Sequence, residues 1–198
     1  LLYSFWTVRE WDVVRVWNVA NYRDVFSSPV YPQLILRSLG VGVATAVLSV
    51  VVVYPLAYTL AFRLEKYRDL ILFLLAISLF GNYVVRIYAW RSILSSNGLV
   101  NYVLMALGLA DGPRSYLMYT PWAVVLVLLN VYIPFATLPI FSALLNIERD
   151  LLDAASDLGA NPLRTFLQVT LPLSMPGVVA AFIFIFLLAA GDFVTPEL

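Results

Sequence analysis

Residues 38–62 read SLGVGVATAVLSVVVVYPLAYTLAF, a run of 25 residues without a charged side chain. An α-helix rises about 1.5 Å per residue, so a helix of this length exceeds the hydrocarbon core of a bilayer, which is about 30 Å thick. The run therefore predicts a transmembrane helix. Small residues recur along it, as they do where helices approach closely in lipid, and Pro55 predicts a kink near its end.

The composition of the rest of the chain agrees with a lipid environment. Of the 198 residues, 62% are hydrophobic and 12% are charged, whereas soluble domains are about half apolar and about a quarter charged. Twelve basic residues balance twelve acidic ones, so the sequence has no basic footprint and we predict no nucleic-acid partner.

The residue types that are missing exclude several kinds of chemistry. The sequence contains neither Cys nor His, so it supplies no thiolate or imidazole for a metal site or for nucleophilic catalysis. Lys66 is the only lysine, and no glycine-rich phosphate-binding loop precedes it. We therefore expect no metal held by Cys or His, no catalysis by these side chains and no binding of ATP through such a loop.

Further uncharged runs predict an all-α, polytopic transmembrane helix bundle that forms one domain over residues 1–198. Residues 115–147 lack any charge and contain Pro134 and Pro139, which predict kinks, whereas five charged side chains crowd into residues 63–69. The number of basic residues does not fix the orientation, because five would lie on the side of that turn and seven on the other. Their density is highest in the short turn at 63–69, which favours the cytoplasmic side for that turn. The expected order is an external loop at 1–37, a span at 38–62, a cytoplasmic turn at 63–69, a span at 70–90, an external loop with a surface helix at 91–120, a span at 121–145, a cytoplasmic loop at 146–175 and a span at 176–191.

The loop at 146–175 contains two helix signatures in succession. Asn146 is a candidate cap for a first helix, and Gly159 is a candidate left-handed stop. Asn161 and Pro162 predict the start of a second helix, which we expect Leu171–Pro172 to end. The first helix is expected to dock an apolar face into a groove of a partner protein. That face comprises Leu151, Leu152, Ala155 and Leu158.

The same loop resembles the cytoplasmic loop of permeases from bacterial binding-protein-dependent ABC importers. That family has Glu-Ala-Ala, three residues, Gly, nine residues and then Ile-x-Leu-Pro, and this chain matches every fixed position, with Asp153 in place of Glu and Val169 in place of Ile. The resemblance implies a loop that couples the permease to an ATPase. Its residues are Asp153, Ala154, Ala155, Gly159, Leu171 and Pro172. The resemblance also implies that this chain is not an enzyme and has no catalytic residue, metal or cofactor, because ATP hydrolysis belongs to the partner.

Other segments are similar to the spermidine/putrescine permease branch of that family. Examples are YPLAY at 54–58, VRIYAW at 85–90, LSMPG at 173–177 and GDFVTP at 191–196. The resemblance implies a type I ABC importer permease in the bacterial inner membrane. Members of that family normally have six spans, which implies that this chain is a fragment. It also implies four kinds of partner: a second permease, two ATP-binding subunits, an extracytoplasmic solute-binding protein and membrane lipid.

A cationic polyamine favours carboxylates and aromatic faces along its pathway. The candidate pathway residues are Asn82, Arg86, Tyr88, Trp90, Asn130 and Asp192. For each of them, anchoring at the membrane interface or hydrogen bonding between helices is an equal alternative. Arg86 has three possible partners: a helix carbonyl, a carboxylate such as Asp192, or an anionic solute such as a phosphonate, which leaves an anion importer open.

Two other classes of membrane protein remain as alternatives. A secondary transporter needs an ionisable relay inside its spans, and no carboxylate falls within a predicted span. A membrane scaffold needs no coupling loop and would not depend on an ATPase.

Overall fold

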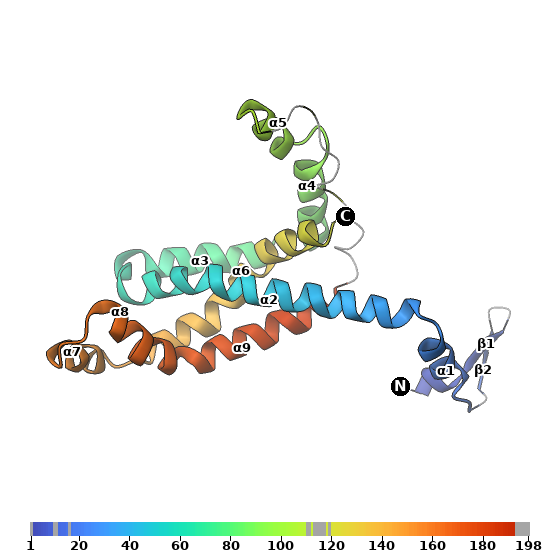
Figure 1. Ribbon diagram of the computed structural model, residues 1–198, viewed down its shortest axis with the longest axis horizontal. Helices are drawn as coiled ribbons and strands as arrows, with labels where there is room; N and C mark the ends of the chain where they lie inside the picture. The colour runs from blue at the N-terminus through green and yellow to red at the C-terminus, as the bar shows by residue number, and fades with distance from the viewer. Residues whose placement is uncertain are drawn as a thin grey trace. The chain divides into compact units, whose positions relative to one another are not determined.

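The computed structural model describes residues 2–9, 12–15, 17–109, 112, 118 and 120–192. The chain divides into two compact units, Leu1–Gly40 and Val41–Leu198. Figure 1 shows the helices and strands of both.

The first unit is a small folded element where the sequence analysis expected only a loop. It contains a 3₁₀ helix at Leu2–Phe5, an antiparallel pair of strands, β1 (Thr7–Arg9) and β2 (Asp12–Val14), and the helix α1 (Ala20–Ser27). The side-chain amide of Asn21 donates hydrogen bonds to the carbonyl oxygens of Ser4 and Trp6, each 2.9 Å long. These bonds tie α1 to the start of the chain. The hairpin is the exception to the predicted all-α fold.

The remaining elements are helices. Helix α2 (Val30–Phe62) begins eight residues before the predicted span and carries the uncharged run of 38–62 along its length. Among the described residues, three helices are long and apolar enough to cross a membrane, or four if one bent pair of helices counts as a span. The helices after α2 are a 3₁₀ helix at Glu65–Tyr67, α3 (Arg68–Leu79), α4 (Tyr83–Leu94), α5 (Leu99–Ala106), α6 (Pro121–Leu145), α7 (Arg149–Asp157), α8 (Pro162–Thr165), a π-helical turn at Phe166–Thr170 and α9 (Leu171–Ala190).

The bent pair lies where one continuous span was expected over 70–90. Helix α3 ends at Leu79, α4 begins at Tyr83, and the segments on either side of the break make an angle of 93°. Asn82 has an extended backbone and caps α4, because its side-chain oxygen accepts hydrogen bonds from the amides of Val84 (2.9 Å) and Val85 (3.3 Å). An N-cap starts a new helix, so the expected continuous helix is broken here.

Helices α2, α6 and α9 build the core of the second unit. At Gly177 of α9, an added Cβ would lie 2.5 Å from both the Ala143 Cβ and the Pro139 oxygen of α6, so the two backbones approach too closely for any side chain there. Close approach through a small residue is typical of helix contacts in lipid. The largest fully buried side chains of the core are Leu60, Leu128, Ile140, Leu144 and Ile185.

The contacts of α9 fix the directions of these helices. Along α2, Gly42 lies against Ala190 and Tyr54 bonds to Ser174, so α2 and α9 are antiparallel. Helix α6 is likewise antiparallel to α9. The end of the bundle that carries residues 63–69 and 146–170 is called the loop end below, and α7 and α8 lie there (Figure 1).

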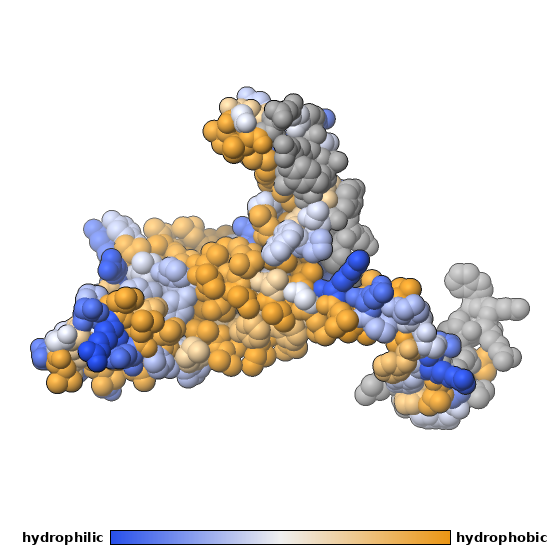
Figure 2. All heavy atoms as spheres, viewed as in Figure 1, coloured by the Kyte–Doolittle hydropathy of each residue, from blue (hydrophilic) through white to orange (hydrophobic). Residues whose placement is uncertain are grey.

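The outer surface of the second unit is apolar. Large hydrophobic side chains such as Val51, Phe73 and Leu187 are more than half exposed. Figure 2 shows a continuous hydrophobic surface along the bundle, with hydrophilic residues gathered at the loop end. An exposed apolar band flanked by polar ends matches a protein whose solvent is lipid.

Candidate functional site

The first half of the predicted coupling loop forms the helix α7. Its N-cap is Glu148, which has an extended backbone, whereas Asn146 has a helical backbone and ends α6. The expectation that Asn146 caps the loop helix is therefore wrong. Ile147 lies between them, is only 6% exposed and packs in the core. Helix α7 therefore begins two residues later than a cap at Asn146 would require.

Gly159 ends α7 in the left-handed conformation that the sequence predicted. Its φ is +80°, and the amide of Ala160 donates to the carbonyl of Ala155 at 3.0 Å, which satisfies a carbonyl of the last turn. Among the described residues other than its two chain neighbours, no atom lies within 4 Å of an added Cβ at this position. Within this chain, the requirement for glycine is thus conformational and not steric.

The second half of the loop starts as predicted and ends differently. The Asn161 side chain accepts a hydrogen bond from the Arg164 amide at 2.8 Å, and Pro162 occupies the first turn. Leu171–Pro172 does not end this helix, because Pro162–Ala190 is one continuous helical segment of 29 residues. The π-helical turn at Phe166–Thr170 comes directly before these residues. A π-turn changes the register of the carbonyls, which accommodates a proline that lacks an amide hydrogen.

The predicted docking face of α7 is divided between solvent and the core. Leu151 and Leu158 are exposed, and Leu158 is 89% exposed. Leu152 and Ala155 are half-buried, and Leu152 packs against the core. Of the other predicted coupling residues, Asp153, Ala154, Gly159 and Pro172 are exposed and Leu171 is half-buried against the core.

Two sets of contacts that the sequence analysis missed attach this loop to the end of α2. Arg149 of α7 forms an ion pair with Glu65, which lies in the charged turn 63–69. The Phe166 ring meets Tyr54 and Tyr58 of α2 edge to face, at centroid distances of 5.7 and 6.0 Å. The sequence features behind these contacts are the charged residues of the two loops and the YPLAY segment. Neither feature identifies the residues with which it pairs.

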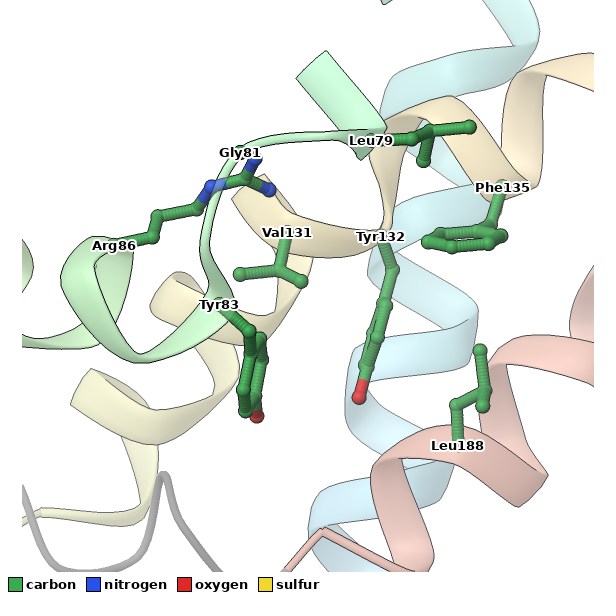
Figure 3. Close-up of a pocket in the computed structure, with 8 residues that line it drawn as sticks. All are labelled: Leu79, Gly81, Tyr83, Arg86, Val131, Tyr132, Phe135 and Leu188. Carbon is green, nitrogen blue, oxygen red and sulfur yellow. The ribbon is translucent and has the colours of Figure 1, made fainter. Parts of the chain in front are cut away.

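A cavity of about 240 Å³ lies beside the break between α3 and α4. Figure 3 shows the Arg86 side chain extended toward the segment that carries Gly81, with the rings of Tyr83, Tyr132 and Phe135 on the same cavity. The Arg86 guanidinium donates a hydrogen bond to the Ser78 carbonyl near the end of α3. Of the three possible partners for Arg86, the structure therefore has the helix carbonyl. The remaining lining residues are Leu79, Val131 and Leu188.

The other candidate pathway residues are only partly brought together. The Asp192 carboxylate accepts a hydrogen bond from the Tyr83 hydroxyl at 2.8 Å, which places it next to a cavity-lining residue. Trp90 donates to the Asn130 side chain at 3.3 Å, a bond between α4 and α6. Tyr88 is 63% exposed. Asn82 is the cap of α4, which gives it a structural role.

The chain is similar to known membrane transport proteins. Residues 34–198 match the family described as binding-protein-dependent transport system inner membrane component. The spermidine/putrescine transport system permease protein PotB of Salmonella typhimurium (strain LT2) is 37% identical over 94% of this chain and 64% of its own length, and PotB of Escherichia coli (strain K12) is 36% identical over 94% of this chain and 67% of its own. This chain thus spans slightly less than two thirds of the Salmonella protein.

The fold is also found in a solved structure. The crystal structure of a bacterial ABC transporter involved in the import of the acidic polysaccharide alginate contains a chain that matches with a TM-score of 0.65 at 18% identity, over 89% of this chain and 66% of that chain. The second unit therefore has the helical fold of an ABC transporter permease. The apolar helices and the family place the protein in the inner membrane as a multi-pass protein. The chain belongs to the family of binding-protein-dependent transport system inner membrane components.

Proposed function

We propose that the chain is a permease subunit of an ATP-driven importer, and that it passes a polyamine such as spermidine or putrescine from an external binding protein into the cytoplasm. The observation that carries this proposal is the 37% identity to a spermidine/putrescine permease over 94% of the chain. A permease is not an enzyme, so ATP hydrolysis belongs to a partner subunit. The family description, which names binding proteins, supports an external solute-binding partner.

The loop end is the proposed contact with two ATP-binding subunits, beside a second permease subunit. Asp153, Ala154 and the exposed Leu158 face away from the core on a short helix that Gly159 stops abruptly. An exposed apolar residue on such a helix suits docking in a groove of a partner. Movement of the ATPase subunits would then displace this loop. The loop end would face the cytoplasm, because ATP is found there.

The cavity beside Arg86 is the proposed part of the solute pathway. The Tyr83, Tyr132 and Arg86 side chains line it, and the Asp192 carboxylate bonds to Tyr83. The aromatic faces and the neighbouring carboxylate favour a cation, whereas the Arg86 guanidinium opposes one. The anionic alternative depends on Arg86 as a solute contact. Its guanidinium donates one hydrogen bond to the Ser78 carbonyl, and its other N–H groups can still bind an anion. The preference for a polyamine therefore comes from the identity to a polyamine permease.

The test is a substrate screen with the complete importer. The permease subunits, the ATPase and the binding protein are reconstituted in proteoliposomes, and ATP hydrolysis and uptake are measured with spermidine, putrescine or 2-aminoethylphosphonate. We expect a polyamine with its binding protein to stimulate both activities. Stimulation by the phosphonate alone would contradict the polyamine assignment, and uptake that does not depend on ATP would contradict the importer.

A further inference from the structure

An aromatic contact joins the loop end to α2. Phe166 lies in the π-helical turn, half-buried, and its ring meets Tyr54 at an interplanar angle of 86° and Tyr58 at 80°. Tyr58 also contacts Phe62, with centroids 5.0 Å apart. Edge-to-face packing fixes the mutual orientation of rings in addition to burying apolar surface. The ring of Phe166 therefore contacts two successive turns of α2, because residues four apart lie on the same face of a helix.

A buried hydrogen bond anchors the same contact one turn further into the bundle. The hydroxyl groups of Tyr54 and Ser174 are 2.7 Å apart, and Ser174 is fully buried. Tyr54 thus contacts the π-helical turn through its ring and α9 through its hydroxyl. The position of Phe166 is set by a side chain that is itself fixed at both ends.

The ion pair forms a second attachment on α7 itself. Arg149 is the first residue of α7, and its partner Glu65 follows the end of α2 by three residues. Both side chains are more than half exposed, so the pair contributes little to stability. Its consequence is geometric: it attaches the first turn of α7 to the charged turn, whereas Phe166 attaches the other side of the loop to α2.

We propose that Phe166 and Arg149 are positioning residues that clamp the coupling loop to the end of α2, so that the loop and the last turns of α2 move as one body. The inference rests on the proposed function for its consequence, since a clamped loop transmits a displacement by the ATPase directly to a membrane-spanning helix. Neither residue belongs to the spaced loop pattern, and neither touches the cavity.

The clamp itself can be tested without transport. Because the sequence contains no cysteine, a spin label on Ser156→Cys reports the motion of α7 alone in the purified permease in nanodiscs. We expect Phe166→Leu to increase the mobility of this label. Phe184→Leu is the matched control, because it is the same change on α9 at a ring that packs against Phe135, away from the loop end. Equal spectra for Phe166→Leu and Phe184→Leu would overturn the clamp.

A further variant protects this test against a folding failure, and charge reversals test the ion pair. Tyr58→Leu removes the same ring contact from the side of α2 and is expected to raise the label's mobility as well, which decides the matter if Phe166→Leu does not fold. For the ion pair, Glu65→Arg and Arg149→Glu each are expected to mobilise the label, and the double reversal is expected to restore the wild-type spectrum. A double reversal that stays as mobile as the single variants would show that the pair is not an attachment.

Uptake by the complete importer is the second measurement, and it separates this inference from the proposed function. We expect Phe166→Leu to lose polyamine uptake while binding-protein-stimulated ATP hydrolysis persists, because the ATPase still closes but its displacement no longer reaches α2. Wild-type complex without polyamine uptake would contradict the proposed function, and the spectra would still decide the clamp. Mobilised spectra with undiminished uptake would refute the role of the clamp in transmission.

Discussion

Gly159 is the residue whose role follows most directly from its backbone. Its φ of +80° lies in the left-handed region, and the space around it within this chain is open. A side chain there costs about 1–2 kcal/mol for most L-residues, while Asn tolerates this conformation better. Substitutions at Gly159 can therefore distinguish a requirement for the left-handed backbone from a requirement for empty space at the surface of the partner protein.

A series of substitutions at Gly159 is expected to be graded. Gly159→Val should reduce uptake most, because a β-branched residue is poorest in the left-handed region, Gly159→Ala should be intermediate and Gly159→Asn mildest. Uptake in vesicles measures the effect, and the amount of permease in the membrane fraction is the control for insertion. If Asn abolishes uptake as completely as Val, the requirement comes from the partner and not from the backbone. Full activity of all three variants would remove Gly159 from the coupling role.

Among the elements, the break between α3 and α4 bears on whether Asn82, a candidate pathway residue, has a structural role or a role in transport. Asn82 caps α4 through two amides, and Arg86 of the same helix returns to the Ser78 carbonyl of α3. Both polar groups of this segment thus stabilise the ends of helices at the break. A polar residue inside an apolar run is therefore explained by the backbone groups that the break exposes.

Removal of the cap is expected to destabilise the permease. Asn82→Ala should lower its thermal unfolding midpoint, since loss of an N-cap costs about 0.5–2 kcal/mol, whereas Asn82→Ser and Asn82→Asp should retain most of the stability. Thermal denaturation of the purified permease in detergent gives the comparison, and uptake with its apparent KM for polyamine is measured in parallel. An unchanged midpoint in Asn82→Ala, together with a raised KM, would return Asn82 to the pathway.

The elements differ in how far the sequence could predict them. Helix α6 covers Pro121–Leu145, the bounds of the predicted span. It could be predicted because it lies within one uncharged run, and a run of apolar residues specifies a buried or lipid-facing helix by itself. The break at Asn82 was missed because the amide was interpreted as a polar group within a span. The continuation of the helix through Pro172 was missed because a proline normally ends one, and the π-helical turn that accommodates it has no signature in composition.

The candidate site shows the same division between local and long-range information. The left-handed Gly159 and the Asn161 cap follow from a few neighbouring residues, and both predictions are confirmed. The pairing of Arg149 with Glu65 joins residues 84 positions apart. Several basic and acidic residues in the two loops offer alternative pairs, so only the packing of the helices selects this one.

At the scale of the whole molecule, the ion pair between Arg149 and Glu65 bears on membrane orientation. It brings the turn 63–69 and the loop 146–170 to one end of the bundle, as the predicted order of spans requires. The basic residues alone do not decide which side that end faces, since five stand against seven. If the loop end contacts ATP-binding subunits as proposed, it faces the cytoplasm, because ATP is in the cytoplasm.

Accessibility of introduced cysteines is expected to confirm this orientation. The chain has no cysteine of its own, so Lys66→Cys and Asp157→Cys each provide a unique target at an exposed position of the loop end. In intact cells we expect both to resist a membrane-impermeant thiol reagent and to react after permeabilisation, whereas Trp17→Cys and Leu107→Cys should react at once. Reaction of Lys66→Cys and Asp157→Cys on opposite sides is incompatible with the ion pair, and reaction of both in intact cells would reverse the orientation and exclude the loop end as the site of the ATPase.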